Sequence, residues 1–219
     1  MKIFLDTANI DAVKQLSALG IIDGITTNPT HLSREGTSPR AQIKELCALL
    51  PHGDISVEVT QSSPDDVYRQ AQEIFKLADN ISVKIPCHSR YYPVIDRLVK
   101  EGVSINVTLV FSVIQSLMMA KLKVAYISPF IGRWEDADGD GIGLLSDIRA
   151  MLDQYGYQTK LLAASLRTPR HLYESIMVGA DVATVPPELL SKSLDHILTD
   201  QGIARFNADW KKLGVVTFP

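Results

Sequence analysis

The sequence has 219 residues, 46% of them hydrophobic and 21% charged, and a formal net charge of -3 at neutral pH. These values are typical of a globular protein long enough to bury a full core, as one large domain or two small ones. The chain has no basic stripe and no long run of like charge, which argues against nucleic acid or an anionic membrane as the main partner and favours a small molecule.

The first residues and the cysteines further limit the kinds of protein that this sequence can represent. The apolar run near residue 4 is cut off by Asp6 and is too short for a signal peptide, and no apolar segment of membrane length follows. We therefore expect a cytoplasmic protein. Cys47 and Cys87 lie far apart, without a CxxC pair or a histidine at ligand spacing, so we expect buried thiols rather than a disulfide or a zinc site.

Short β-branched runs alternate with longer helical patterns along the chain. In the first half we expect strands at 2–7, 24–28, 55–60 and 81–86, each followed by a helix, at 9–19, 39–50, 64–78 and 90–101. In the second half we expect strands at 105–110, 125–130, 160–165 and 182–186 and helices at 112–121, 144–155, 169–178 and 187–198. One further helix is expected at about 200–213.

This order of elements predicts the fold class. Strands that alternate with helices pair in parallel through right-handed crossovers, and eight such units indicate a closed (β/α)₈ TIM barrel with an additional C-terminal helix. A doubly wound open sheet is the alternative. No linker or change of composition divides the chain, so we expect a single domain over residues 1–219.

Several of the predicted strands are half polar, although buried parallel strands are normally apolar throughout. Apolar residues alternate with Ser56, Glu58 and Thr60 in one strand and with Ser82 and Lys84 in the next. The strand at 105–110 places Asn106 and Thr108 on one face and Ile105, Val107 and Leu109 on the other. In a barrel, the apolar set can face the helices while the polar set points into the interior.

Further polar or aromatic residues stand at or just after the carboxyl ends of strands, where barrel enzymes form their active sites. They are Asp6, Asn28, Ser128, Phe130, Ser165 and Arg167. Any one of them alone is more readily explained as a helix cap or a solvated group. Together, Asp6, Glu58 and Lys84 would form a buried charge cluster, which is costly unless the charges are paired or used in chemistry.

A lysine inside a barrel suggests a specific reaction. Burial lowers the pKa of an amine and frees it to attack a carbonyl, and the resulting Schiff base is an electron sink beside which a carbon–carbon bond can break or form. Lys84 with Asp6 and Glu58 has the composition that this chemistry needs. The alternative is a structural ion pair between Lys84 and Glu58, and the pattern alone does not decide between them.

Segments across nearly the whole chain combine into a more specific pattern. They are FLDTAN at 4–9, GITTNPT at 24–30, VEVT at 57–60, VKIP at 83–86, NVTLVFS at 106–112, SPFIGR at 128–133, AASLR at 163–167 and GADVATVP at 179–186. VKIP alone is a weak signal, but together these segments resemble the small transaldolase and fructose-6-phosphate aldolase family of class I aldolases, which are (β/α)₈ enzymes with a lysine Schiff base.

The resemblance implies roles for individual residues. Lys84 matches the Schiff-base lysine, Asp6 the acid/base that takes the proton of the substrate's C4 hydroxyl, and Glu58 with Thr108 the pair that acts through a water. Asn28, Asn106 and Ser128 match positions that orient the sugar or the imine. Arg133, Ser165 and Arg167 match a phosphate site, which suits the paired donors of a guanidinium. On the sequence alone, a surface position is as good an explanation for either arginine.

Two positions separate transferases from simple aldolases in this family. Aldolases tend to have tyrosine and glutamine where this chain has Phe130 and Glu58. The resemblance therefore implies a transaldolase of the non-oxidative pentose phosphate pathway. It would move a dihydroxyacetone unit from sedoheptulose 7-phosphate or fructose 6-phosphate to an aldose phosphate, without metal or organic cofactor. The alternatives are a fructose-6-phosphate aldolase that releases free dihydroxyacetone and a non-catalytic barrel that binds sugar phosphates.

Two segments lie outside this pattern. Residues 136–147 nearly match a calcium loop, but a strand end is expected before them instead of a helix, so we interpret them as a flexible acidic loop. The last predicted helix places Ile203, Phe206, Trp210 and Leu213 on one face, before an apolar tail at 215–219. Similar small transaldolases form rings of five, often paired, so we expect a homo-oligomer, a pentamer or a decamer.

Overall fold

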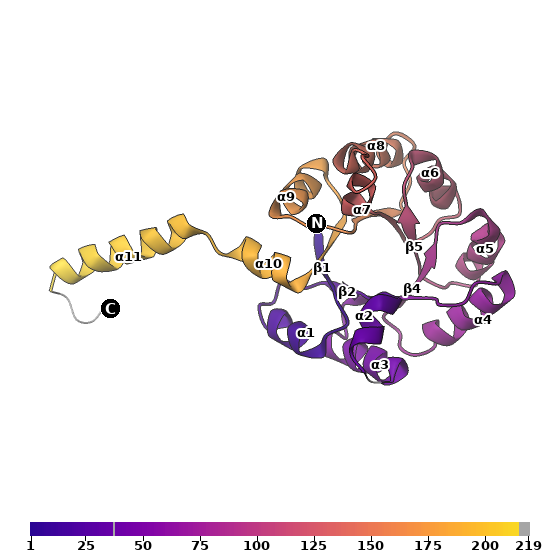
Figure 1. The fold of residues 1–219 in the computed structure, drawn as a ribbon, viewed down its shortest axis with the longest axis horizontal. Coiled ribbons are helices and arrows are strands. Elements are labelled where there is room, and N and C mark those ends of the chain that lie inside the picture. Colours follow the sequence, from indigo (N-terminus) through magenta and orange to yellow (C-terminus); the bar gives the residue numbers. More distant parts are fainter. Residues whose placement is uncertain (37, 215–219) are drawn as a thin grey trace.

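The computed structural model describes residues 1–36 and 38–214. In this part of the chain, parallel strands close into a barrel in sequence order, and the helices surround it (Figure 1). The strands are β1 (Lys2–Asp6), β2 (Gly24–Thr26), β3 (Asp54–Glu58), β4 (Ile81–Pro86), β5 (Ile105–Val110), β6 (Tyr126–Pro129), β7 (Lys160–Ala163) and β8 (Val182–Val185). The predicted (β/α)₈ barrel is confirmed, and the open sheet is wrong because β1 pairs with β8.

The helices follow the strands in the expected alternation. They are α1 (Ile10–Ser17), α2 (Pro29–Arg34), α3 (Pro39–Leu49), α4 (Pro64–Phe75), α5 (Tyr92–Lys100), α6 (Val113–Lys121), α7 (Ile131–Glu135), α8 (Gly141–Gln154), α9 (Pro169–Val178), α10 (Pro187–Leu194) and α11 (Ile197–Lys212), with a short 3₁₀ turn at Ser89–Tyr91. The predicted C-terminal helix is α11. Among the described residues, no helix is both long enough and apolar enough to span a membrane.

The alternation along β3 and β4 divides the two sides of the sheet as predicted. Ile55 pairs with Ile81 and Val57 with Val83, and all four belong to the core between strands and helices. The pair that follows, Glu58 and Lys84, lies in register on the opposite side. Since neighbouring residues of a strand point to opposite faces, the apolar set anchors the barrel and leaves the polar set for its interior.

The strand β5 departs from the predicted alternation. Its pairing with β6 shifts between Val107 and Val110, and Leu109 adopts a left-handed backbone with φ 56°. Val110 is buried in the core, whereas Leu109, which we expected on the apolar face, is only partly buried. The bulge follows directly after Thr108, at the end of the strand where the site was predicted.

Two short helices, α2 and α7, were not predicted. The expectation of a strand end immediately before residue 136 is wrong, because α7 lies between β6 and this segment. The prediction of a flexible acidic loop is wrong for its second half, since α8 begins at Gly141 and Asp140 caps it by accepting a hydrogen bond from the Gly143 N–H at 2.8 Å.

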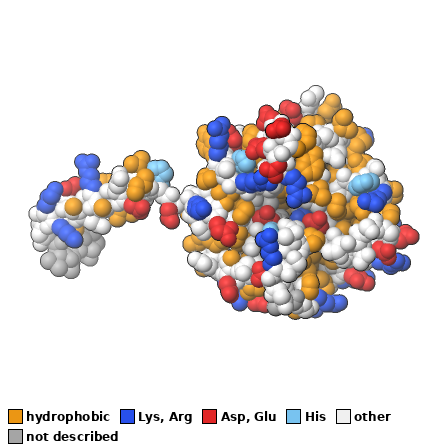
Figure 2. Space-filling view, viewed as in Figure 1, with side chains coloured by type: hydrophobic (Ala, Val, Ile, Leu, Met, Phe, Trp, Pro, Cys, Tyr) orange, Lys and Arg blue, Asp and Glu red, His pale blue; other side chains and the backbone are white. Residues whose placement is uncertain are grey.

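Helix α11 extends away from the barrel (Figure 1) and contains no buried residue. Its side chains Ile203, Phe206 and Leu213 are 54%, 72% and 66% exposed. The predicted apolar face is therefore open to solvent in the single chain, and Figure 2 shows hydrophobic side chains on the surface of α11. The apolar tail at 215–219 lies outside the described residues.

Candidate active site

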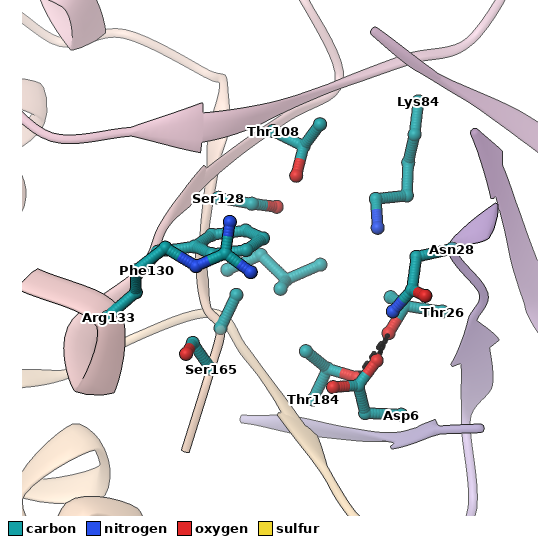
Figure 3. Close-up of a pocket in the computed structure, with 12 residues that line it drawn as sticks. Asp6, Thr26, Asn28, Lys84, Thr108, Ser128, Phe130, Arg133, Ser165 and Thr184 are labelled. Atoms are coloured by element: carbon teal, nitrogen blue, oxygen red, sulfur yellow. Dashed lines mark hydrogen bonds between the residues drawn. The ribbon is translucent and has the colours of Figure 1, made fainter. Parts of the chain in front are cut away.

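A cavity of about 110 Å³ opens at the carboxyl ends of the strands (Figure 3). Most of the predicted site residues line it, which confirms that separate strands bring them together. The lining residues are Asp6, Thr26, Asn28, Lys84, Thr108, Ser128, Phe130, Arg133, Leu162, Ala164, Ser165 and Thr184. Glu58, Asn106 and Arg167, which were also predicted, are not among them.

Lys84 is the buried cation of this cavity. The residue is only 5% exposed, and its Nζ lies 3.2 Å from Glu58 Oε2 and donates to the Thr27 carbonyl oxygen at 2.9 Å. In Figure 3 the amine points from β4 into the cavity. The ion pair that the structural alternative required is thus present, but it leaves the amine at the cavity wall, where it can meet a carbonyl carbon.

Thr108 lines the same cavity as Lys84, and its side-chain hydroxyl is not used in any hydrogen bond of the described structure. Its Oγ1 is buried and forms no hydrogen bond within the described residues. Buried hydroxyls are normally bonded, because an unpaired one costs free energy. A group left in this state at a cavity wall is suited to hold a water or a substrate oxygen.

Asp6 lies on the side of the cavity opposite Thr108 and Ser128 (Figure 3). Its Oδ1 accepts a hydrogen bond from Thr26 Oγ1 at 3.0 Å, and that hydroxyl is bonded to Thr184 Oγ1 at 2.6 Å. The carboxylate is therefore oriented by two threonines that line the same cavity. Sequence reasoning missed Thr26 and Thr184, although both lie in the quoted segments GITTNPT and GADVATVP.

His31 lies beside the site, although the sequence pattern did not assign it a role there. Its Nδ1 lies 3.8 Å from Asp6 Oδ1, and both ring nitrogens are near the amide of Asn28, at 3.2 and 3.3 Å. Burial lowers the pKa of His31, against the opposing charge of Asp6, so the neutral ring is favoured at neutral pH. Only its position three residues after Asn28, on the α2 helix that we did not predict, links it to the site.

Asn106 and Ser128 form one polar pair. Ser128 Oγ donates to Asn106 Oδ1 at 2.6 Å, and Asn106 Nδ2 donates to Ser56 Oγ at 3.1 Å. Asn106 is fully buried beneath the cavity, so the residue in contact with the cavity is Ser128. Asn28 lines the wall and also caps α2, because its Oδ1 accepts a hydrogen bond from the His31 N–H at 2.9 Å.

Arg133, Phe130 and Ser165 form another part of the cavity rim. The Arg133 guanidinium lies over the Phe130 ring, 5.1 Å from its centroid, and Phe130 contacts Phe111 edge to face at 6.2 Å. Ser165 closes the rim with a left-handed backbone at φ 60°, a conformation that costs energy for a residue with a side chain. Arg167 instead pairs with Asp136, outside the cavity.

Two other kinds of reactive site would depend on clustered metal ligands or on cysteine thiols. The described residues contain no group of three or more His, Cys, Asp or Glu that could hold a metal ion. Cys47 and Cys87 are free and buried, as expected, and burial raises the pKa of each thiol to about 11. At neutral pH both are protonated and are poor nucleophiles.

Comparisons of the sequence with known proteins show which family the chain belongs to. The family model described as transaldolase/fructose-6-phosphate aldolase matches residues 3–216. A probable transaldolase of Dehalococcoides mccartyi is 47% identical over 97% of this chain and 99% of its own length. Probable transaldolases of Lactiplantibacillus plantarum and Methanococcus maripaludis are 46% and 44% identical, over 96% of this chain and 97% and 98% of theirs. The chain belongs to the transaldolase/fructose-6-phosphate aldolase family.

Proposed function

We propose that this protein is a transaldolase that transfers a dihydroxyacetone unit between sugar phosphates through a Schiff base on Lys84. The supporting observation is the position of the Lys84 amine, buried at the wall of the cavity, with Glu58 as its ion-pair partner and the unpaired Thr108 hydroxyl lining the same cavity. The relatives named probable transaldolase support the same reaction class.

Schiff-base formation is the first step of the proposed reaction. The neutral Lys84 amine attacks the donor's C2 carbonyl after its proton passes to Glu58, which lies 3.2 Å away. The carbinolamine then loses its hydroxyl as water, with the proton returned through Glu58 and a water held by Thr108. The product is an iminium, which withdraws electrons from the neighbouring carbon–carbon bond.

Bond cleavage follows on the other side of the cavity. Asp6 takes the proton of the C4 hydroxyl, the bond between C3 and C4 breaks, and its electron pair moves into the enamine on Lys84. The aldose phosphate leaves. The enamine then attacks the aldehyde carbon of the acceptor, Asp6 returns the proton to the new hydroxyl, and hydrolysis of the iminium releases the product ketose. Thr26 and Thr184 keep the Asp6 carboxylate in place during both transfers.

The substrates' phosphate groups are expected at the rim. Arg133 lines the cavity, and its guanidinium presents paired donors to phosphate oxygens. Ser165 adds a hydroxyl beside it. We propose sedoheptulose 7-phosphate or fructose 6-phosphate as donor, an aldose phosphate as acceptor, and a place in the non-oxidative pentose phosphate pathway.

Borohydride trapping tests the proposed covalent step. The protein is reduced with and without fructose 6-phosphate, digested, and mapped by mass spectrometry. We expect a sugar-derived adduct on the peptide that contains Lys84, formed only when the sugar is present. An adduct confined to another lysine would contradict the assignment of Lys84, and no adduct at all would favour a non-catalytic barrel.

The second candidate is a fructose-6-phosphate aldolase, which releases dihydroxyacetone instead of passing it on. Phe130 favours the transferase, because a phenyl ring packed against Phe111 brings no hydroxyl that could carry a proton to the enamine. Product analysis with and without an acceptor aldehyde phosphate separates the two. A transaldolase gives little free dihydroxyacetone in either case.

We also propose that the protein is a homo-oligomer that associates through α11 and is located in the cytoplasm. The exposed apolar face of α11, with Phe206 72% exposed, is the support for association with a second copy of this chain. Light scattering after gel filtration tests it. We expect a mass of five or ten chains, and a monomeric mass would contradict the proposal.

A further inference from the structure

Arg167 does not lie where the resemblance places it. Arg133 and Ser165 line the cavity, whereas Arg167 does not. Its guanidinium instead forms a two-point ion pair with Asp136, the residue that ends α7, in which Nη1 donates to Oδ1 and Nη2 donates to Oδ2. These hydrogen bonds raise the pKa of Arg167 and lower that of Asp136, so both groups are charged at neutral pH.

The backbone keeps Arg167 close to the cavity even though its charge is directed away. Gly132 donates from its N–H to the Ser165 carbonyl at 3.0 Å, which joins α7 to the segment after β7. A Cβ on Gly132 would lie 2.8 Å from Arg167 Nε and 2.6 Å from the Ser165 carbonyl oxygen. The Arg167 side chain therefore lies across α7 at Gly132, the residue next to Arg133.

A second contact fixes the main chain of Arg167. Its N–H donates to His171 Nδ1 at 3.3 Å, and His171 Nε2 lies 3.0 Å from Glu135 Oε2. The main chain of Arg167 is thus held between α7 and α9. With the main chain held in this way, the guanidinium changes direction by rotation about its side-chain bonds.

The ion pair itself is easily exchanged. The side chains of Arg167 and Asp136 are 48% and 56% exposed, and exposed pairs of this kind contribute little to stability. A phosphate group carries more negative charge than a carboxylate and has three acceptor oxygens. With Arg133 already beside it, a phosphate can compete successfully with Asp136 for Arg167.

We propose that Asp136 competes with the substrate's phosphate group for Arg167, and that it holds the guanidinium outside the phosphate site until a phosphate replaces its carboxylate. The inference rests on the proposed function, which identifies the rim near Arg133 as the phosphate site. A neutral sugar cannot displace Asp136 and so gains nothing from Arg167. Asp136 also lowers the affinity of the site for phosphate, because each phosphate must compete with it.

Calorimetric titration with inorganic phosphate tests this without turnover. We expect Asp136→Asn to lower the phosphate dissociation constant about two- to fivefold, the range that exposed ion pairs allow. Asp138→Asn is the matched control, because it removes the same charge two residues further along the chain, at an exposed position with a left-handed φ of 59° that asparagine tolerates. An unchanged or weaker affinity in Asp136→Asn, or an equal gain in Asp138→Asn, would overturn the proposal.

A double substitution separates release of Arg167 from general electrostatics. In an Arg167→Met background, Asp136→Asn is expected to leave phosphate affinity unchanged, since no guanidinium remains to be released. A gain that persists there contradicts the proposed mechanism. Absence of measurable phosphate binding in both the wild type and Asp136→Asn would also overturn it.

Kinetics give an independent measurement on the whole reaction. We expect Asp136→Asn to lower KM for fructose 6-phosphate by the factor seen for phosphate, to leave kcat within about twofold, and to leave KM for unphosphorylated fructose unchanged. Reduced kcat with unchanged KM would show that Asp136 acts elsewhere. If wild-type protein binds phosphate but has no transaldolase activity, the proposed function fails while the calorimetric result still decides the role of Asp136.

Discussion

The two ends of the barrel interior contain similar polar residues, but at one end these side chains bond mainly to one another and at the other end they face a cavity. At the amino ends of the strands, Asp54 Oδ2 accepts from Ser82 Oγ at 2.9 Å and from Tyr126 OH at 3.1 Å, and Ser82 and Ser104 share a hydrogen bond at 2.7 Å. At the carboxyl ends, Lys84 and Thr108 face a cavity. The first group is bonded within itself through Asp54 Oδ2, although Asp54 Oδ1 has no hydrogen-bond partner among the described residues, whereas the second group faces a cavity that can hold a ligand.

An aromatic pair closes the amino end. Phe4 is fully buried and meets Tyr126 edge to face at 6.1 Å. A Cβ on Gly24 would lie 2.7 Å from the Phe4 ring, so glycine is what allows this ring to fill the barrel there. One end is therefore filled by side chains for stability, and the other is left open for chemistry, a division typical of (β/α)₈ enzymes.

The comparison of the two ends predicts the largest effect for Lys84 at the carboxyl end, with Lys160, an exposed lysine at the amino end of β7, as its counterpart. We expect Lys84→Met to reduce transaldolase activity by at least about 1000-fold, because no other group can form the Schiff base. Lys160→Met at the amino end, where the amine lies 5.8 Å from the Tyr126 ring centroid, is the control and should keep near-normal activity. Steady-state assays of both variants measure the difference, and comparable losses would contradict the division between the two ends.

The hydroxyls of Thr108 and Ser82 allow the same comparison of the two ends with uncharged groups. Thr108→Val removes a hydroxyl that has no hydrogen-bond partner among the described residues, so we expect unchanged or slightly higher stability and an activity loss of about 100-fold. Ser82→Ala removes a hydroxyl bonded to Asp54 and Ser104, so we expect unchanged activity and a loss of about 1–2 kcal/mol in the free energy of unfolding. Urea denaturation and activity assays check both variants, and a Thr108→Val protein that loses stability but not activity would refute the assignment.

A smaller change is expected for Phe130→Tyr, which adds a hydroxyl to the open end without removing a contact of the ring. The phenol would bring a proton donor to the enamine, so we expect the ratio of free dihydroxyacetone to transferred product to rise severalfold. Product analysis by chromatography, with wild type and Phe111→Tyr as controls, measures this ratio. Unchanged partitioning would show that Phe130 does not keep the enamine from protonation.

Much of the architecture follows from local sequence patterns. The alternation of Glu58 and Lys84 with valine and isoleucine placed them inside the barrel, because a strand's side-chain period is fixed by its backbone. The bulge at Leu109 could not be predicted, since it depends on how β5 pairs with β6 and not on the residues of β5 alone. The short helices α2 and α7 were missed because each extends over too few residues for a helical period to show.

The site was predictable in its residues but not in its contacts. Pattern and resemblance named Arg167, but the sequence gives no signal that Asp136, an aspartate in an acidic segment, lies within reach of its guanidinium. The contact between His31 and Asp6 has no signal in the sequence either, because only the pairing of β1 with β2 brings these two residues together. Pairings of this kind depend on tertiary structure and are absent from any local pattern.

The smallest expected effect concerns Asp54, the carboxylate of the closed end. Burial raises its pKa, partly offset by hydrogen bonds from Ser82 and Tyr126. The folded protein therefore holds this proton more tightly than the unfolded chain, and stability falls as pH rises from the unfolded pKa of about 3.9 through the raised folded pKa. Asp54→Asn removes that ionisation, so its stability relative to wild type should increase as pH rises across this range.

Urea unfolding between pH 4 and pH 7 measures this difference, with Tyr126→Phe as the companion variant. Losing the Tyr126 hydrogen bond raises the pKa of Asp54 further, so Tyr126→Phe should show a steeper loss of stability with pH, the opposite of Asp54→Asn. Activity should stay near that of wild type in both variants, because neither residue lines the cavity. If Asp54→Asn instead abolished activity in a folded protein, the two ends of the barrel would be coupled, and the division between a structural and a chemical end would be wrong.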